Sequence, residues 1–284
     1  MKQSDKVILV TGASSGIGFD AARTLAQRGH RVYAAARRVE LMEPLRGLGV
    51  KVLRMDVTDE QSMSEGVASL LQAEGRIDVL VNNAGYGYFG AVENVPMAEA
   101  RRQLEVNVFG LARLCQLVLP AMRRQGSGRI VNTSSIAGRA VFYMGAWYNV
   151  TKYAVEALSD ALRMEMRPFG IDVVLVEPGP IRTDWGLIAA RHLRESSAGT
   201  PYEAQAAPWA STMAWAYRSA LFSGPQVITR AVCRAVESRR PRTRYCRGRG
   251  ARLSLLLHAL LPARWWDALM RRMASLRLGR GAEV

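Results

Sequence analysis

The sequence predicts an α/β fold built on a doubly wound parallel sheet, and three observations indicate it. Short apolar runs alternate along the 284 residues with longer segments of helical periodicity. Between 13 and 47 residues separate successive runs, enough for a helix to connect two parallel strands. A glycine-rich turn directly follows the first run. Since such crossovers place helices on both faces of a sheet, we expect one large domain with a buried sheet.

The expected strands are short and rich in Val, Ile, Leu and Ala. Six runs qualify: Val7–Val10, Val32–Ala36, Val50–Leu53, Ile77–Val81, Arg129–Thr133 and Ile171–Val176. The segments between them carry helix-start patterns, such as the capping-box spacing of Thr58-Asp-Glu-Gln61. A weaker run at Thr243–Cys246 follows a predicted helix over Gln226–Glu237. We therefore expect about seven strands.

Two segments depart from this alternation. Residues 183–224 are rich in Ala, Ser and aromatic residues and stand where a strand should lead directly into a helix, so we expect an inserted lid. Residues 253–278 place six large apolar side chains on one helical face and arginines opposite: Trp265, Trp266, Leu269, Met270, Met273 and Leu276. The expected division is a main domain over 1–250 and a basic amphipathic helical extension over 251–284. That helix either docks on the protein's own core or binds a membrane surface or a partner.

Composition places the chain among globular proteins, because 49% of its residues are hydrophobic and 22% are charged. The longest nearly apolar stretch, Leu253–Leu261, has nine residues, so no transmembrane helix is expected. The first apolar run is too short for a secretory signal, and we expect a cytoplasmic protein. Cys115, Cys233 and Cys246 form no CxxC pair, and the histidines have no spaced partners. Neither a disulfide framework nor a metal site is expected.

The formal net charge of +15 is concentrated at one end of the chain. Residues 239–284 contain twelve arginines against Asp267 and Glu283, a net charge of +10. Such a segment can attract nucleic acid, anionic lipid or an acidic carrier protein, or it can simply be a solvated tail.

The first candidate binding motif is Thr11-Gly12-Ala-Ser14-Ser15-Gly16-Ile17-Gly18, between the first strand and a helix. A glycine turn at such a junction lets backbone N–H groups and the positive helix end approach a pyrophosphate, and its last glycine allows close helix packing. The spacing GxxxGxG differs from the dinucleotide fingerprint GxGxxG, and a purely structural turn is the alternative.

Arg37 and Arg38 follow the second strand, where an NAD-binding chain usually carries Asp or Glu on the ribose 2′-hydroxyl. A carboxylate would repel a 2′-phosphate, whereas a guanidinium binds one with charge-assisted hydrogen bonds. The pair therefore favours NADP(H) over NAD(H), although ordinary surface arginines would look the same in so arginine-rich a chain.

Tyr148 and Lys152 lie four residues apart in a segment with helical periodicity, so both point to one face. A neighbouring ammonium favours the phenolate and is expected to lower the tyrosine pKa, which makes Tyr148 a candidate acid/base. Ser135 stands at the end of a predicted strand, where ligands bind in such folds.

Taken in order, these motifs resemble the short-chain dehydrogenase/reductase superfamily over about residues 5–250. Thr11–Gly18 resembles its cofactor glycine motif, and Asp56-Val57 its adenine contact. Asn82-Asn83-Ala84-Gly85 resembles the segment that supports the central sheet. Asn107, Ser135, Tyr148 and Lys152 match its catalytic tetrad, and Pro178-Gly179-Pro-Ile181-Arg-Thr183 matches its nicotinamide-side loop. The resemblance implies a Rossmann-type fold and an oxidoreductase that transfers hydride between nicotinamide and a carbonyl or alcohol carbon.

The resemblance also implies a role for each tetrad residue. Tyr148 would exchange a proton with the substrate oxygen, and Ser135 would hydrogen-bond that oxygen as charge develops. Lys152 would tune Tyr148 and bind the nicotinamide ribose, and Asn107 would hold a water that links Lys152 to solvent. Members of the superfamily commonly form dimers or tetramers through the helices that carry Asn107 and Tyr148, so a homodimer or homotetramer is expected.

The substrate is expected to be lipophilic, because aromatic and apolar residues flank the motifs. Tyr86, Tyr88 and Phe89 follow Gly85, and Val141–Met144 lies between Ser135 and Tyr148. Such a pocket offers few polar partners to a sugar or hydroxy acid. The stretch Asn83–Val95 and the region beyond Gly224 resemble the hydroxysteroid and retinol dehydrogenase-like members.

Three alternatives remain at this stage. A 3-oxoacyl carrier-protein reductase would suit the positive charge, but its usual chain is shorter. A non-catalytic NADP(H)-sensing protein would not need the four intact catalytic residues. Nucleic-acid binding by the basic end is the third alternative, which the enzyme motifs disfavour.

Overall fold

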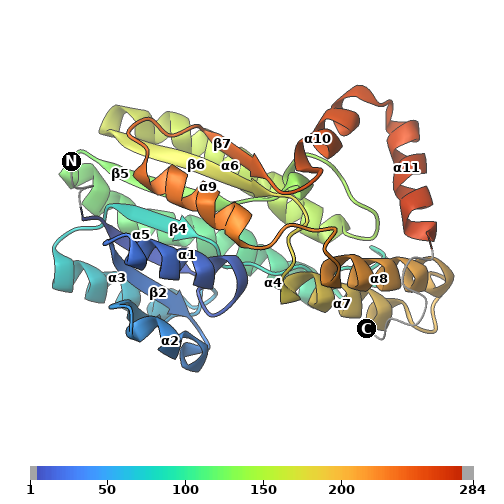
Figure 1. The fold of residues 1–284 in the computed structure, drawn as a ribbon, viewed down its shortest axis with the longest axis horizontal. Helices are drawn as coiled ribbons and strands as arrows, with labels where there is room; N and C mark the ends of the chain where they lie inside the picture. The colour runs from blue at the N-terminus through green and yellow to red at the C-terminus, as the bar shows by residue number, and fades with distance from the viewer. Residues whose placement is uncertain (1–4, 277–284) are drawn as a thin grey trace.

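A parallel sheet of seven strands forms the centre of the structure, a computed structural model that describes residues 5–276 (Figure 1). The strands are β1 (Val7–Thr11), β2 (Arg31–Ala36), β3 (Lys51–Arg54), β4 (Val79–Asn82), β5 (Gly128–Thr133), β6 (Ile171–Pro178) and β7 (Arg244–Arg247). Their order is β3-β2-β1-β4-β5-β6-β7, with every pairing parallel. The doubly wound Rossmann-type sheet is confirmed, and the strand order reverses between β1 and β4, where such folds bind ligands.

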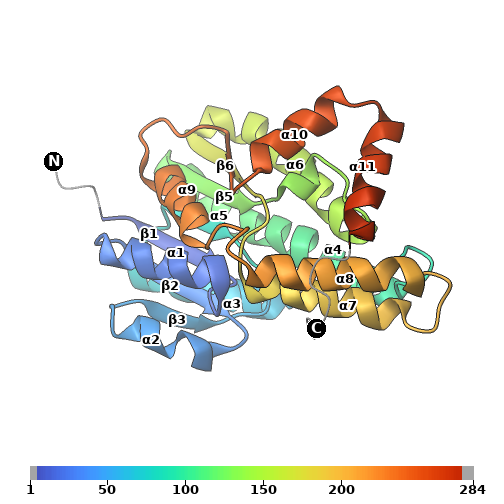
Figure 2. The ribbon, with the colours of Figure 1, turned by 45° about the vertical axis from the view of Figure 1, so that its right-hand side comes forward.

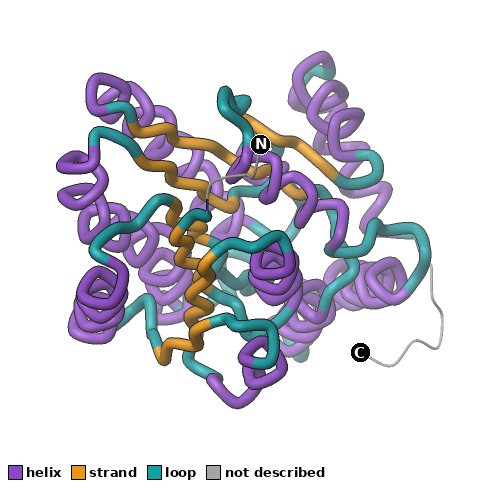
Figure 3. The backbone as a smooth tube through the Cα atoms, turned by 60° about the vertical axis from the view of Figure 1, so that its left-hand side comes forward, coloured by secondary structure: helices purple, strands orange, loops and turns teal. Residues whose placement is uncertain are grey.

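Helices cover both faces of the sheet (Figure 3). One face packs against α1 (Gly16–Gln27), the short α2 (Glu43–Arg46) and α9 (Gln226–Glu237). The other packs against α3 (Glu60–Glu74), α5 (Gly110–Gln125) and α6 (Ala146–Met166), and α4 (Met97–Leu104) leads into α5. Side chains alternate between the two faces, so Ile8 and Val10 enter the first core while Val7 and Leu9 enter the second. Burial on both faces explains the continuous apolar runs.

One helical stretch is more apolar than expected. Residues Met97–Gln125, which comprise α4, a π-helical turn (Glu105–Phe109) and α5, are long and apolar enough to cross a membrane by length and composition alone. The sequence analysis expected no transmembrane helix, because the longest nearly apolar run that it found had only nine residues; this helical stretch is much longer. Leu111, Leu114 and Val118 of α5 are buried in the core of the second sheet face, which accounts for the apolar composition.

The segment after β6 forms two helices, α7 (Asp184–Ser197) and α8 (Glu203–Arg218), which lie side by side at one end of the sheet (Figure 2). Alanines form their contact, since Ala189 and Ala190 of α7 share a cluster with Ala206, Ala210 and Ala214 of α8. Small side chains let the two helices approach closely. Phe89 and Tyr148 belong to the same cluster, so the pair of helices is joined to the active-site side of the sheet.

The amphipathic segment after β7 is two helices, where the sequence pattern predicted one. These are α10 (Ala251–Leu260) and α11 (Ala263–Ser275), which project beyond β7 and turn toward α8 (Figure 1). Pro262 stands at the break, since proline has no N–H to continue the α10 hydrogen bonds. The predicted shared face also splits: Trp266 is 5% exposed and Trp265 is 68% exposed. The last predicted residues of the helix, 277–278, lie outside the described residues.

Candidate active site

A large cavity of about 1260 Å³ lies at the carboxyl ends of the strands. It is lined by Ser135, Tyr148 and Lys152 of the predicted tetrad. All predicted cofactor residues except Gly18 line it as well: Gly12, Ser14, Ser15, Gly16, Ile17, Arg37, Arg38, Asp56, Val57, Asn83, Ala84, Gly85, Pro178, Gly179, Ile181 and Thr183, with Tyr148 and Lys152. Motifs that are up to 171 residues apart in sequence, from Gly12 to Thr183, thus meet in one place. Asn107 and Gly18 are outside the lining.

Two glycines shape the nucleotide end of the cavity. Gly12 has φ +64, and a Cβ there would lie 2.7 Å from the Cα of Ala84. A Cβ on Gly18 would lie 2.4 Å from the carbonyl oxygen of Gly12, closer than real Cβ atoms approach. Gly18 is outside the cavity lining, and its missing side chain lets α1 pack closely against the turn. Close helix packing is the function expected of the last glycine of the motif.

The start of α1 faces this end of the cavity. The helix begins at Gly16, and the side chain of its N-cap residue, Ser15, accepts no hydrogen bond from the first turn. The first N–H groups of a helix otherwise lack partners and carry partial positive charge, so they can bind a phosphate. The cradle between Gly12, α1 and Ala84 fits a dinucleotide pyrophosphate.

Arg37 and Arg38 lie at the rim of the same end. Both follow β2 directly, are exposed and line the cavity. An Arg38 guanidinium nitrogen is 3.5 Å from the hydroxyl of Ser14, which connects it to the glycine turn. Among the described residues neither arginine forms an ion pair with a carboxylate, so both guanidinium groups remain available for an anionic group of the cofactor.

The three catalytic candidates in the cavity come from two elements. Ser135 follows β5, where its hydroxyl accepts the N–H of Ala137 at 3.1 Å. Tyr148 and Lys152 lie one turn apart on α6, which begins at Ala146. The Lys152 ammonium donates to the carbonyl of Thr133 at 2.9 Å and lies 5.8 Å from the centre of the Tyr148 ring. The end of β5 thus supports both Ser135 and Lys152.

Burial determines the electrostatics of these residues. It raises the pKa of Tyr148 to about 12, and a hydrogen bond with Ser135 only partly opposes this. The expected lowering of the Tyr148 pKa is therefore wrong for this arrangement, because desolvation of the buried phenol dominates. Burial also lowers the pKa of Lys152 to about 8, against the attraction of the nearby Glu156 carboxylate. Near neutral pH the pair is a phenol beside a lysine close to its titration point.

Asn107 supports the site from behind. It lies in the π-helical turn before α5 and is 1% exposed. Its side-chain oxygen accepts the N–H of Tyr86 at 3.0 Å, and its amide nitrogen donates to the carbonyl of Tyr86 at 2.8 Å and to the hydroxyl of Thr151 at 3.0 Å. The side chain therefore joins the loop after β4 to α6 and holds Gly85 beside Lys152. A bridging water at Asn107 stays a prediction.

The sequence analysis missed a partly buried ionic cluster behind Lys152, in which the carboxylates of Glu156 and Glu177 are buried. Arg244 of β7 contacts Glu156 at 3.2 Å, Asp160 at 2.6 Å and Glu177 at 3.1 Å, and Glu177 also contacts Arg139 at 3.4 Å. Burial raises the carboxyl pKa of both Glu156 and Glu177, while Arg244 opposes the rise. The one available sequence pattern was the spacing of Glu156, a helical turn after Lys152.

Aromatic residues form the substrate end of the cavity. The ring of Tyr148 lies 4.9 Å from Trp185 of α7 and 5.8 Å from Phe89, centre to centre. The far wall comes from the C-terminal helices, through Leu253 and Leu257 of α10 and Leu269, Met270 and Met273 of α11. The sequence analysis assigned this segment to core, membrane or partner, but in the structure it also lines the pocket.

Comparison with known proteins agrees with this geometry. A family model described as short chain dehydrogenase matches residues 6–189. A probable short-chain type dehydrogenase/reductase, VdlC, from Helicobacter pylori is 36% identical over 263 residues, covering 93% of this chain and 96% of that protein. The 3-ketodihydrosphingosine reductase of Bacteroides thetaiotaomicron is 42% identical over 180 residues, which is 63% of this chain and 65% of that protein.

Solved structures show the same fold. A short-chain dehydrogenase from Streptomyces avermitilis has a TM-score of 0.76 and 34% identity, with 94% of this chain and 96% of that chain covered. An actinorhodin polyketide ketoreductase with NADPH has a TM-score of 0.69 and 32% identity, with 82% of this chain and 91% of that chain covered. A short-chain dehydrogenase/reductase from Burkholderia phymatum in complex with NAD has a TM-score of 0.74 and 26% identity, with 86% of this chain and 90% of that chain covered.

These neighbours bind one or the other nicotinamide dinucleotide, and the cradle described above fits that group. The matched region contains the glycine turn, the tetrad and the loop after β6. The chain therefore belongs to the short-chain dehydrogenase/reductase family and is an oxidoreductase that acts on CH–OH or C=O groups with a nicotinamide cofactor.

Proposed function

We propose that the protein is an NADP(H)-dependent oxidoreductase of lipophilic ketones, aldehydes or alcohols, with Tyr148 as the proton donor or acceptor. The observation that carries the proposal is the single cavity that joins the glycine turn and Arg37 at one end to an apolar, aromatic chamber at the other. Ser135, Tyr148 and Lys152 lie on its lining, where the two ends meet.

The cofactor, when bound, supplies or accepts the hydride. The residues of the chain handle the substrate oxygen: Ser135 donates a hydrogen bond to it, and Tyr148 donates a proton as negative charge develops. Because burial raises the pKa of Tyr148 to about 12, the phenol is protonated at neutral pH, which is the state that reduction requires. Lys152, held by Thr133, places its charge near the phenolate that remains.

The preference for NADP(H) rests on Arg37 and Arg38. Their guanidinium groups stand at the end of β2, at the rim of the cavity, without a carboxylate partner among the described residues. A 2′-phosphate would supply that partner through charge-assisted hydrogen bonds, whereas a 2′-hydroxyl would leave both charges uncompensated.

The proposal of a lipophilic substrate rests on the side chains that line the aromatic chamber. Trp185, Trp209, Met213 and Phe222 line it, and α10 and α11 add further leucines and methionines. Apolar walls of this extent favour substrates that bury hydrocarbon, at about 25 cal/mol per Å². The similarity to a 3-ketodihydrosphingosine reductase supports a long-chain ketone, and a steroid-like or retinoid-like compound fits the same chemistry.

The test is consumption of NADPH and NADH by the purified protein with a panel of long-chain ketones, aldehydes, steroids and retinoids. We expect turnover with NADPH, and loss of about 10²–10⁴ in turnover for Tyr148→Phe with folding intact. An unchanged rate in Tyr148→Phe would contradict the assigned chemistry. Acetoacetyl thioesters in the same panel test the carrier-protein reductase, and tight NADPH binding without any turnover would favour the sensor.

Two further proposals concern association. Phe109, Val150 and Tyr153 are exposed apolar or aromatic residues on and beside the helices that carry Asn107 and Tyr148, which supports a homodimer or homotetramer through that surface. Light scattering after gel filtration tests it.

Leu256 and Leu260 of α10 and Trp265 of α11 are also exposed, which supports peripheral membrane contact of a cytoplasmic protein. Co-sedimentation with vesicles that is unchanged in Leu256→Glu/Leu260→Glu would exclude it.

A further inference from the structure

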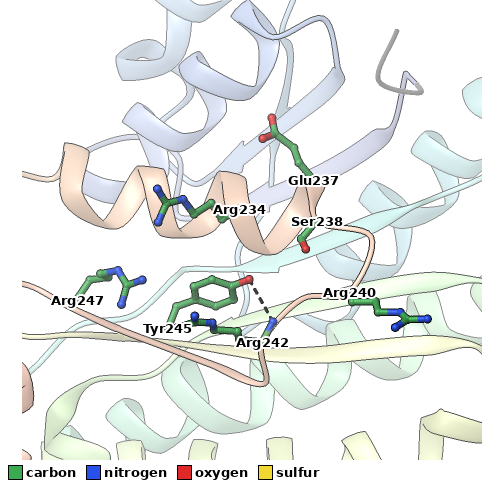
Figure 4. Close-up of a pocket in the computed structure, with 7 residues that line it drawn as sticks. All are labelled: Arg234, Glu237, Ser238, Arg240, Arg242, Tyr245 and Arg247. Carbon is green, nitrogen blue, oxygen red and sulfur yellow. Dashed lines mark hydrogen bonds between the residues drawn. The ribbon is translucent and has the colours of Figure 1, made fainter. Parts of the chain in front are cut away.

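A second cavity lies outside the active site, in the trough between α9 and β7. It has a volume of about 440 Å³ and is lined by four arginines and two hydroxyl side chains, together with Glu237 (Figure 4). The lining residues are Arg234, Glu237, Ser238, Arg240, Arg242, Tyr245 and Arg247. None of them lines the catalytic cavity. We refer to this place as the arginine trough.

The arginines of the trough lack counter-charges. Among the described residues no carboxylate lies within ion-pair distance of Arg234, Arg240, Arg242 or Arg247. The one carboxylate in the lining, Glu237, is bound to Arg28 at 2.7 Å and faces His30 at 3.5 Å. In Figure 4 it points away from the other side chains. The trough therefore contains four positive charges and no free negative one.

Strand alternation shows that this imbalance belongs to one face of β7. Arg244 points to the α6 side, where it contacts Glu156, Asp160 and Glu177. Tyr245 and Arg247 are offset by one and three positions, so they point to the α9 side. The same short strand thus carries an arginine paired with three carboxylates on one face and, on the other, Arg247, whose guanidinium donates only to the carbonyl of Cys246 at 2.9 Å among the described residues.

Two of the four guanidinium groups of the trough converge. Figure 4 shows Arg234 on α9 and Arg247 on β7 extending toward one another beside the ring of Tyr245, while Arg240 points away. Burial and repulsion from Arg252, Arg234 and Arg242 lower the pKa of Arg247. Bringing like charges together costs free energy, and an anion bound between them would recover it.

One hydroxyl group lies at the Arg242 side of the trough (Figure 4). Tyr245 is 4% exposed, and its hydroxyl oxygen accepts the main-chain N–H of Arg242 at 3.2 Å. Among the described residues no acceptor receives the Tyr245 hydroxyl hydrogen, which leaves it to donate. The guanidinium groups of Arg234 and Arg247 are the donors that would bind the oxygens of a phosphate group with charge-assisted hydrogen bonds.

We propose that the arginine trough is a second anion site, which binds the phosphate or pyrophosphate group of a phosphorylated compound. The volume lies within the roughly 300–1,000 Å³ of small-molecule pockets, so an organic group attached to the phosphate also fits. The phosphate belongs either to a free phosphorylated molecule or to a phospholipid headgroup. The site is independent of the oxidoreductase reaction.

The test measures binding of inorganic pyrophosphate by titration calorimetry at constant ionic strength, because screening changes any basic surface. Three double variants are compared with the unaltered protein. Arg234→Gln/Arg247→Gln removes the converging pair, and Arg37→Gln/Arg38→Gln alters the cofactor rim. Arg101→Gln/Arg124→Gln removes the same charge from exposed positions elsewhere. Circular dichroism and thermal melting check the fold of each variant.

We expect Arg234→Gln/Arg247→Gln to weaken one class of pyrophosphate sites at least about tenfold. The Arg101/Arg124 variant should leave that class unchanged, and the Arg37/Arg38 variant should affect only the other class. Equal weakening in the Arg101/Arg124 variant would show attraction by net charge alone and would overturn the proposal. So would pyrophosphate binding that depends on Arg37 and Arg38 only.

Vesicles distinguish the two sources of the phosphate. Phosphatidic acid vesicles that bind the protein through Arg234 and Arg247, with phosphatidylcholine vesicles as control, would identify a lipid headgroup as the ligand. Pyrophosphate binding without such vesicle binding would identify a free phosphorylated compound. Failure of both ligands to depend on Arg234 and Arg247 overturns the proposal.

Discussion

The indole N–H of Trp266 on α11 donates a hydrogen bond of 2.9 Å to the main-chain carbonyl of Val141. The same ring packs edge-on against Phe142 and His258, at 6.3 and 4.9 Å between centres. Val141 and Phe142 belong to the loop between Ser135 and Tyr148. Trp266 therefore fastens the C-terminal helices to the segment that connects two catalytic residues.

Replacing Trp266 with Ala should loosen α11 and open the far wall of the substrate chamber. We expect kcat/KM for a long-chain ketone to fall about tenfold or more, and kcat/KM for a short ketone to change less than about threefold. Trp265→Ala is the matched control, because that neighbouring ring is exposed. A uniform loss for short and long substrates would show that Trp266 supports the whole site and not the far wall.

Replacing Arg37 with Asp should reverse the charge that, in the proposed NADP(H) complex, would meet the 2′-phosphate. We expect the Kd for NADPH to rise about tenfold to a hundredfold, as for a lost hydrogen bond to a charged group, and the Kd for NADH to change only slightly. Cofactor fluorescence titration measures both. Equal weakening of the two cofactors would sink the assignment of NADP(H) preference to this residue.

Replacing Glu156 with Gln should move the pH dependence of the reaction. The Glu156 carboxylate raises the pKa of Lys152, which burial holds at about 8. Without that charge the pKa of Lys152 falls, and the lysine loses its proton at lower pH. On the alkaline side of the pH profile, the pH at which kcat/KM declines should therefore fall by about one pH unit. Asp160→Asn, which removes another carboxylate from Arg244, should shift it far less; matching shifts would refute the specific role of Glu156.

Replacing Gly18 with Ala should destabilise the glycine turn. The added Cβ would lie 2.4 Å from the carbonyl oxygen of Gly12 and 2.5 Å from the side-chain nitrogen of Asn83. We expect a loss of about 1–3 kcal/mol in urea denaturation and weaker cofactor binding. Gly47→Ala is the control, since its Cβ would meet nothing closer than 3.9 Å. Unchanged stability in Gly18→Ala would mean that α1 shifts without cost.

The strands and the glycine turn could be predicted from the sequence because their causes are local. Runs such as Ile8–Val10 are apolar on both faces of a parallel sheet, so the pattern alone identifies them. Most of the predicted site residues line one cavity because parallel strands bring their carboxyl ends together, whatever the distance in sequence. Each predicted strand overlaps an observed one.

The features that were missed depend on contacts between distant elements. The pKa of Tyr148 follows from its burial under Trp185 and Phe89, which no spacing reveals. Arg244 and Glu156 are 88 residues apart, so their pairing is visible only once β7 lies beside β6. Pro262 is a sequence signal for the break between α10 and α11. The sequence analysis nevertheless predicted one helix, because the helical periodicity continues on both sides of this proline.

The hairpin of α10 and α11 follows the last strand of the sheet and contributes no member of the tetrad and no part of the glycine turn. Its side chains nevertheless line the same cavity as Tyr148. Part of the wall that meets the substrate is therefore encoded in a stretch of the gene that is separate from the tetrad. Exchange of this hairpin between related enzymes would alter which molecules are accepted, and hydride and proton transfer would stay intact where the contact of Trp266 with Val141 is kept.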